Sequence, residues 1–298
     1  MPMSRRARSQ ILLLSLLALP LAATAAPQAS KPATLPPGVA ADWLEKLNPS
    51  IDSKTAAYIV MNDHPMGSQI RIHEGSQQIA GHPFVVAPMT ASVRGMDVSG
   101  YQGNVNWNGA WANGARFTYI KATEGTYYKN PYFTQQYNGS YNVGMIRGSY
   151  HFARPDTTSG ATQADYFVNH GGGWSKDGKT LPGVIDMEYN PYGSTCYGLS
   201  QRQMAAWITS FSNEYHYRTS RWPVIYTSNS WWSQCVGTAG NWSNNSPLWV
   251  ARYASAVGTL PWPWGFYTFW QFADSGVFPG DQNLFNGAYS RLVALANG

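Results

Sequence analysis

The pattern that most restricts the fold is the alternation of short apolar runs with helical stretches after residue 94. The runs predicted as strands are residues 95–99, 117–122, 145–152, 183–187, 223–227, 248–253 and 267–272. The clearest helix is predicted over residues 200–217, where apolar side chains recur at helical spacing behind a capping Ser200. Strands alternating with helices predict a parallel sheet, and seven or eight strands predict a closed β/α barrel of the TIM type. Weak helical signals between the late strands predict an irregular barrel.

The first 26 residues have the pattern of a secretory signal peptide. Arg5, Arg6 and Arg8 precede the apolar run ILLLSLLALPLAA and the small residues Ala23 to Ala26. We therefore expect a secreted, extracellular protein without a membrane anchor, exported by either the general secretory or the twin-arginine route.

Residues 27–94 differ in composition from the rest of the chain and are predicted to be an N-terminal extension. Trp43 is the only tryptophan before residue 95, and the other twelve lie between Trp107 and Trp270. Within the extension, ADWLEKL is predicted as a helix, and AAYIVM and PFVVA as strands. His64, His73 and His82 match no metal-ligand spacing. The extension is a prosegment, a small wall-contacting module or a spacer, and the sequence leaves these three roles open.

The chain contains two cysteines, Cys196 and Cys235. Export to an oxidising compartment predicts that they form one disulfide, the alternative being two buried thiols.

Ten carboxylates follow residue 94, and two of them, Asp186 and Glu188, stand at the end of the apolar run Val184-Ile185. Their i, i+2 spacing predicts that both side chains project from one side of a strand end, where barrel enzymes place their chemistry. Repulsion and partial burial would separate the two pKa values, leaving one acid protonated and one ionised. Cleavage of a glycosidic bond requires such a pair.

Asp97 and Asp281 are further candidates, because Asp97 ends the first predicted strand and Asp281 lies in a Gly-Asp-Gln-Asn loop near the last one. The first and last strands of a closed barrel are neighbours, so both acids could face the same cleft. The alternative is that both cap turns.

Aromatic residues at predicted strand ends favour a sugar substrate, since Tyr and Trp faces pack against pyranose rings. The predicted substrate-binding aromatics are Tyr101, Tyr150, Tyr189, Tyr226, Trp249 and Trp270.

Seven segments, in this order, resemble the lysozymes of glycoside hydrolase family 25. They are GMDVSGYQGNVNW, FTYIKATEGTYYKNPYF, GMIRGSYHFARPD, LPGVIDMEYNP, VIYTSNSWW, LWVARY and FWQF, and the resemblance begins near Gly95. Glu124 and Arg252, which belong to these segments, complete the predicted substrate-binding set.

The resemblance implies an irregular barrel of five β/α units and three further strands that hydrolyses the β-1,4 bond after N-acetylmuramic acid. It makes Glu188 the general acid, Asp186 its strand partner, and Asp97 and Asp281 the acids of the first and last strands. It further implies retention of anomeric configuration and tolerance of 6-O-acetylated muramic acid. The nucleophile is either Asp186 or the substrate's acetamido group; wide spacing of the two carboxyl groups favours the acetamido group.

The expected partner is bacterial peptidoglycan, acted on by a monomer that needs no metal or other cofactor. No basic cluster indicates a nucleic-acid site. A chitinase-like barrel is a weaker alternative, because chitinases have an acid where this chain has Val184. A catalytically inactive carbohydrate-binding protein is another, although such a protein would be expected to have lost Asp186 or Glu188.

Overall fold

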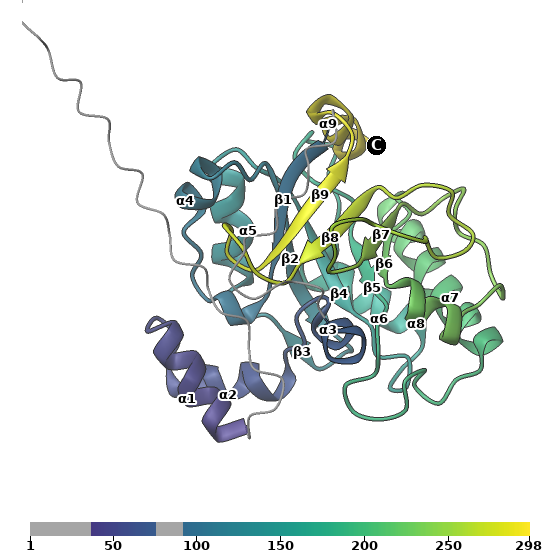
Figure 1. Cartoon of the computed structure of the whole chain (residues 1–298), viewed down its shortest axis with the longest axis horizontal. Coiled ribbons are helices and arrows are strands. Elements are labelled where there is room, and N and C mark those ends of the chain that lie inside the picture. Colours follow the sequence, from purple (N-terminus) through teal and green to yellow (C-terminus); the bar gives the residue numbers. More distant parts are fainter. Residues whose placement is uncertain (1–36, 76–91) are drawn as a thin grey trace, which may run out of the picture.

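The computed structural model describes residues 37–75 and 92–298 (Figure 1). The signal-peptide prediction, the PFVVA strand and His82 lie outside the described residues. The helices are α1 Pro37–Leu47, α2 Ser53–Asn62, α3 Ser68–Glu74, the 3-10 turn η1 Gly100–Gln102, α4 Trp107–Ala112, α5 Phe133–Asn142, α6 Gly160–Phe167, the π-turn η2 Val168–Gly172, α7 Gln201–Thr219, α8 Asn229–Cys235 and α9 Tyr289–Asn297. The strands are β1 Ser92–Val98, β2 Phe117–Glu124, β3 Tyr128–Lys129, β4 Ile146–Phe152, β5 Val184–Asp186, β6 Val224–Thr227, β7 Leu248–Ala251, β8 Phe269–Ala273 and β9 Asp281–Asn286.

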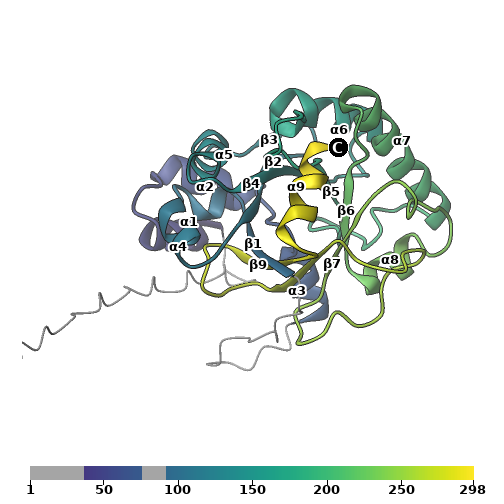
Figure 2. The same cartoon turned by 90° about the horizontal axis from the view of Figure 1, so that it is seen from above.

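Eight of these strands close into a barrel in the order β1-β9-β8-β7-β6-β5-β4-β2, and β2 pairs back onto β1 (Figure 2). Pairing is parallel from β1 through β2, β4, β5, β6 and β7 to β8, and β9 runs antiparallel to both of its neighbours. A helix follows each of β1, β2, β4, β5 and β6, before β7, β8 and β9 complete the ring. This is the predicted arrangement of five β/α units and three further strands.

Aromatic side chains fill the barrel interior. The Trp249 ring lies 4.9 Å from that of Tyr119 and 5.4 Å from that of Phe269. Because β2 is not adjacent to β7 in the sheet, the contact between Tyr119 and Trp249 crosses the interior. The barrel is therefore a packed core, and a substrate can reach only its end.

Strand β9 was not among the predicted strands, because its sequence DQNLFN starts with three polar residues. In the barrel, Gln282 and Asn283 are buried and bonded to other polar groups, so the polar run continues the sheet. Asp281 consequently begins a strand, in register with Asp97 of β1.

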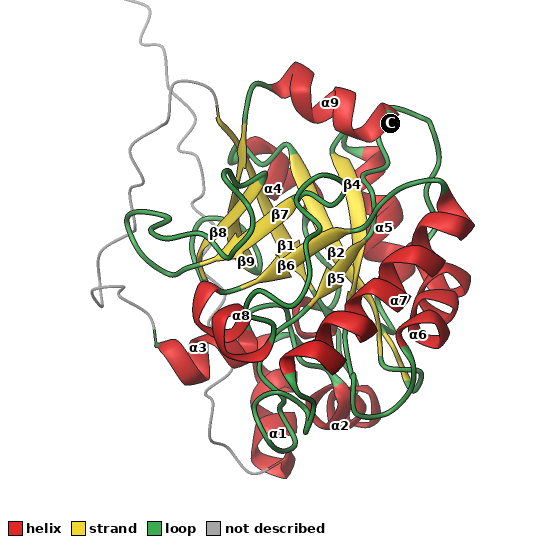
Figure 3. Ribbon diagram, turned by 90° about the vertical axis from the view of Figure 1, so that its right-hand side faces the viewer, coloured by secondary structure: helices red, strands yellow, loops and turns green. Residues whose placement is uncertain are grey.

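The extension forms three helices, so the strand prediction for AAYIVM was wrong. Asp52 caps α2 by accepting a hydrogen bond from the Thr55 amide at 3.0 Å, and Ala56, Ile59 and Val60 form a buried helical face. The ADWLEKL helix is confirmed within α1. Figure 3 shows α1, α2 and α3 at one end of the barrel.

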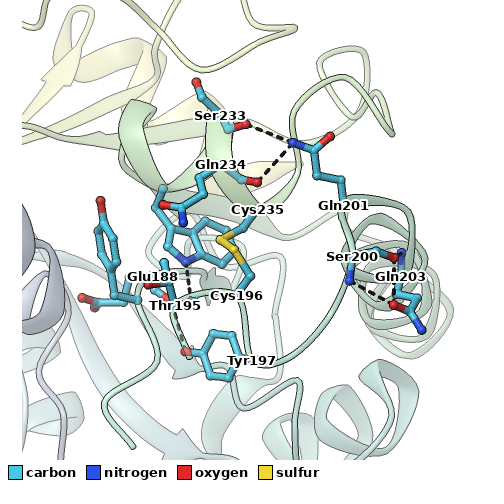
Figure 4. Close-up of a disulfide and its surroundings, with 12 residues drawn as sticks. Glu188, Thr195, Cys196, Tyr197, Ser200, Gln201, Gln203, Ser233, Gln234 and Cys235 are labelled. Carbon is cyan, nitrogen blue, oxygen red and sulfur yellow. Dashed lines mark hydrogen bonds between the residues drawn. A yellow bond between two sulfur atoms is a disulfide. The ribbon is translucent and has the colours of Figure 1, made fainter. Parts of the chain in front are cut away.

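The predicted disulfide joins Cys196, in the loop after β5, to Cys235 at the end of α8 (Figure 4). The Tyr197 hydroxyl, next in the chain, donates a 3.0 Å hydrogen bond to the Glu188 carbonyl. The disulfide thereby ties down the loop that carries Glu188. None of the described helices has the length and apolar character needed to cross a membrane.

Candidate active site

The four predicted acids meet at one end of the barrel. Asp97 and Asp186 lie near the carboxyl ends of β1 and β5, Glu188 follows β5 by two residues, and Asp281 begins the antiparallel β9. Asp97, Asp186 and Glu188 are almost fully buried, with at most 2% of each exposed.

Gln271 of β8 joins the acids of the first and last strands. Its side-chain amide donates to Asp97 at 3.0 Å and to Asp281 at 2.9 Å, and Asn283 donates a further 2.7 Å bond to Asp97. Burial raises the pKa of Asp97 to about 7, although both amide donors act in the opposite direction. Desolvation and the charge of Asp97 raise the pKa of Asp281 well above its ordinary value.

Asp186 and Glu188 form a second pair with contrasting surroundings. Both carboxyl oxygens of Asp186 are buried and receive no hydrogen bond from any described residue. Burial, then the charge of Glu188, raises the pKa of Asp186 well above its ordinary value. Burial also raises the pKa of Glu188, to about 7, but three main-chain N–H groups favour its ionised form. The three amides therefore favour negative charge on Glu188 over negative charge on Asp186.

A buried lysine faces the pair from β2. The Lys121 ammonium contacts Asp63 at 2.8 Å and Glu124 at 2.7 Å, and all three side chains are fully buried. Burial opposes the charge of Lys121, but the two carboxylates outweigh burial and raise the pKa of the ammonium. His64 contacts Glu124 at 2.7 Å. Burial opposes ionisation of Glu124, yet His64 and Lys121 keep the pKa of this carboxyl below its usual range. Glu124 thus sits in an ion-pair network with the extension.

Four of the predicted substrate-binding aromatics surround the acids or contact the extension. The hydroxyl of Tyr150 accepts a hydrogen bond from the Met66 amide, and that of Tyr226 donates to Gln271 at 2.6 Å. The Tyr189 ring stacks on the extension at the rim, and Tyr101 packs in the hydrophobic cluster formed by α1 and α2.

Three other predicted residues are not brought to the acids. Trp249 lies deeper, inside the barrel, and its indole donates to Asn283. Trp270 packs against Tyr267 and Phe272, and its indole donates to the Arg252 carbonyl. Adjacent side chains of a strand point to opposite faces, so Trp270 points away from Gln271 and its acids. Arg252 is exposed in the loop after β7, next to Gly258.

Several residues around the acids were not predicted from the sequence. Gln271 and Asn283 bind Asp97 directly, and Tyr253 donates to Gln271 at 2.9 Å. Lys121 did carry a signal, because a lysine inside the strand FTYIKATE has to find a charge partner when that strand is buried on both faces. Gln271 and Asn283 lie in strand sequences that contain no comparable indication of a role in the site.

A cavity of about 290 Å³ runs between the extension and the barrel. Its walls include Asp281, Tyr101 and Tyr253 from the barrel, and Trp43 and residues 63–69 from the extension. Asp186 and Glu188 are not among its lining residues. The extension thus separates the central acid pair from this cavity.

The raised pKa of Asp97 predicts a pH-dependent stability difference for the Asp97→Asn variant. In the folded chain Asp97 holds a proton up to about pH 7, against an ordinary pKa of 3.8. Stability from this group is present at pH 3 and is lost as pH rises through that window, because the unfolded chain releases the proton first. Asparagine resembles the protonated acid, so the variant should be more stable than the original at pH 8 by roughly 2 to 4 kcal/mol, and similar to it at pH 3. Urea unfolding at both pH values measures this difference; a constant difference would contradict the assigned pKa.

Comparison with known proteins agrees with this geometry. The sequence profile described as glycosyl hydrolases family 25 matches residues 96–281. Lysozyme M1 of Streptomyces globisporus is 47% identical over 237 residues, which cover 78% of this chain and 81% of the relative. The N,O-diacetylmuramidase of Chalaropsis is 51% identical over 211 residues, which cover 70% of this chain and 100% of the relative.

Among solved structures, a family GH25 lysozyme from Aspergillus fumigatus superposes with a TM-score of 0.69 at 50% identity, covering 70% of this chain and 100% of that one. Profile, sequence relatives and structure all match the barrel that carries the four acids. The chain belongs to glycosyl hydrolases family 25.

Proposed function

We propose that this chain is a lysozyme that hydrolyses the β-1,4 bond between N-acetylmuramic acid and N-acetylglucosamine in bacterial peptidoglycan. The observation that carries the proposal is the buried pair Asp186 and Glu188 at the barrel end, with Asp97 and Asp281 beside it, in a chain 47% to 51% identical to proteins named as lysozyme and muramidase. The catalytic unit we propose is the barrel from residue 95 to 298.

In this proposal Glu188 is the general acid. Its carboxyl protonates the glycosidic oxygen as the bond to the muramic acid carbon breaks, and then takes a proton from the water that completes hydrolysis. Burial raises the pKa of Glu188, which is the direction that a carboxyl needs if it has to hold a proton near neutral pH.

Asp186 acts on the substrate's acetamido group. Its two oxygens are buried without a donor among the described residues, so an acetamide N–H would supply the hydrogen bond that they lack. An ionised Asp186 would orient the acetamido oxygen toward the anomeric carbon and stabilise the positive charge that develops there, with retention of configuration. Asp97 and Asp281, bridged by Gln271, border the same space.

Two finer features belong to the same proposal. Residues 1–26 direct export, because a basic start, an apolar run and small residues follow one another there. Tolerance of 6-O-acetylated muramic acid is supported by the relative named as an N,O-diacetylmuramidase.

Product analysis tests the proposal. The full chain and, in parallel, residues 92–298 would be incubated with purified peptidoglycan, and the soluble products reduced with borohydride and identified by mass spectrometry. Reduced N-acetylmuramic acid ends are expected. Reduced glucosamine ends would identify a glucosaminidase, and the absence of products from both preparations would favour the inactive binding protein.

A further inference from the structure

The main chain of the extension lies directly on the proposed general acid. The amide of Gly67 donates to one oxygen of Glu188 at 2.8 Å, and the amides of Gln69 and Ile70 donate to the other at 2.8 and 3.0 Å. Glu188 is fully buried beneath them. A general acid has to reach the glycosidic oxygen of its substrate, and here both oxygens are already bound.

The same segment also contacts the polar residues that surround Asp186 and Glu188. The Met66 amide donates to the Tyr150 hydroxyl at 3.1 Å, and the Met66 carbonyl lies 3.3 Å from the Gln271 side-chain nitrogen, which donates to Asp97 and Asp281. The Gly67 carbonyl lies 3.1 Å from the Tyr253 hydroxyl and competes with Gln271 for its single proton. These polar groups line the space where a sugar would lie, so the peptide takes the hydrogen bonds that a sugar would make.

Specific contacts hold the segment at both ends. At one end, Asp63 pairs with Lys121, and the Lys121 ammonium also donates to the His64 carbonyl at 2.6 Å. At the other end, Arg71 pairs with Asp274 at 2.9 Å, and Glu74 accepts a 3.0 Å hydrogen bond from Tyr189.

An aromatic contact resembles the way a sugar ring would bind. The His73 ring stacks on the Tyr189 ring, with 4.1 Å between centroids and 6° between planes. A pyranose packs on a tyrosine face in the same manner. Polar, charged and stacking contacts together make the segment complementary to the site.

The docked segment also favours the wrong protonation states of Glu188 and Asp186 for hydrolysis. Three N–H groups stabilise ionised Glu188, and the resulting negative charge contributes to the raised pKa of Asp186. The proposed reaction needs a protonated Glu188 and an ionised Asp186. The docked state therefore opposes catalysis by its charge as well as by occupancy.

We propose that residues 63–74 are an autoinhibitory segment, which occupies the peptidoglycan site of this chain and keeps the enzyme latent until it is displaced or removed. The inference rests on the proposed function. Of the three roles that the sequence left open for the extension, these contacts favour the prosegment.

Gly67 offers a variant that prevents docking. Its φ is +82°, and a Cβ there would collide with the Tyr253 hydroxyl and lie 2.7 Å from that of Tyr226. Gly75, at the end of α3, has a similar φ of +73°, but its Cβ would meet nothing within 4 Å. Gly67 has a ψ of −5° and lies in the left-handed helical region, whereas Gly75 has a ψ of −175° and lies in a region essentially restricted to glycine. Gly75→Leu therefore carries at least as much backbone strain as Gly67→Leu, but only Gly67→Leu also drives a side chain into the barrel and is expected to expel the segment.

Two measurements on the full chain test the proposal. Carbodiimide coupling of glycine ethyl ester, read by mass spectrometry, reports whether Glu188 is accessible without requiring activity, and release of soluble fragments from peptidoglycan reports hydrolysis. Gly67→Leu is expected to label at Glu188 and to hydrolyse peptidoglycan at least roughly tenfold faster than the original chain, because the open state is no longer a minor population. Gly75→Leu is expected to match the original in both.

The outcomes separate the inference from the proposed function. Equal hydrolysis by the original chain and Gly67→Leu, with Glu188 labelled only in the variant, would overturn autoinhibition and leave the lysozyme standing. Labelled Glu188 with no hydrolysis in any variant would overturn the lysozyme assignment, and autoinhibition with it. If Gly67→Leu does not fold, Gln69→Pro serves instead, since proline has no N–H to donate to Glu188 and disfavours the helical conformation of Ser68 at the start of α3.

Discussion

The Glu188→Gln substitution is expected to lower the rate of peptidoglycan hydrolysis by about 10²- to 10⁴-fold. Glutamine has nearly the shape of glutamic acid but no proton to give to the leaving sugar oxygen. The comparison should be made in the Gly67→Leu background, where the segment does not cover position 188. Initial rates of release of reducing ends measure the effect.

Glu214→Gln is the matched control, because Glu214 lies on α7, away from the acid cluster. It should retain the original rate. A Glu188→Gln rate within a few-fold of the original would show that another group protonates the leaving oxygen. The lysozyme assignment could survive that result, but the role of Glu188 could not.

The Lys121→Met substitution is expected to lower the free energy of unfolding of the full chain by about 3 to 5 kcal/mol. Lys121 is the cation between Asp63 and Glu124, and none of the three side chains is exposed. Methionine would fill a similar volume, but it would leave the buried carboxylates of Asp63 and Glu124 without the ammonium group that pairs with both. Urea unfolding followed by tryptophan fluorescence measures the loss.

Lys176→Met, in an exposed turn, is the control and should change stability little. The chain of residues 92–298 provides a second comparison, because it lacks Asp63. In that shorter chain, Lys121→Met would leave only the Glu124 carboxylate without its cation. A loss that is equally large in both chains would show that Asp63 contributes little to the network.

The barrel and the position of its acids could be predicted from local sequence patterns. Burial on both faces makes barrel strands short and apolar, and this signature is local, so seven of the eight barrel strands were found within a few residues. Asp186 and Glu188 were recognisable because they follow a short apolar run. The disulfide could be predicted because the sequence contains only one pair of cysteines.

The exceptions were segments whose structure depends on distant partners. The β9 sequence is polar, yet it forms a strand because β1 and β8 supply the hydrogen-bonding groups on both sides. AAYIVM has the residues of a strand, yet the cap at Asp52 and packing in the cluster with α1 make it a helix. Local propensity is weaker than these tertiary contacts.

The contacts between the extension and the acids could not be predicted before the chain was folded. Nothing in the local pattern of residues 63–74 indicates that their amides bind a carboxylate more than 100 positions further along the chain. Main-chain N–H groups are the same in every residue except proline, so a site built from them leaves no mark in the sequence. The acids could be read from their own residues, whereas the group that covers them became visible only when the chain was folded.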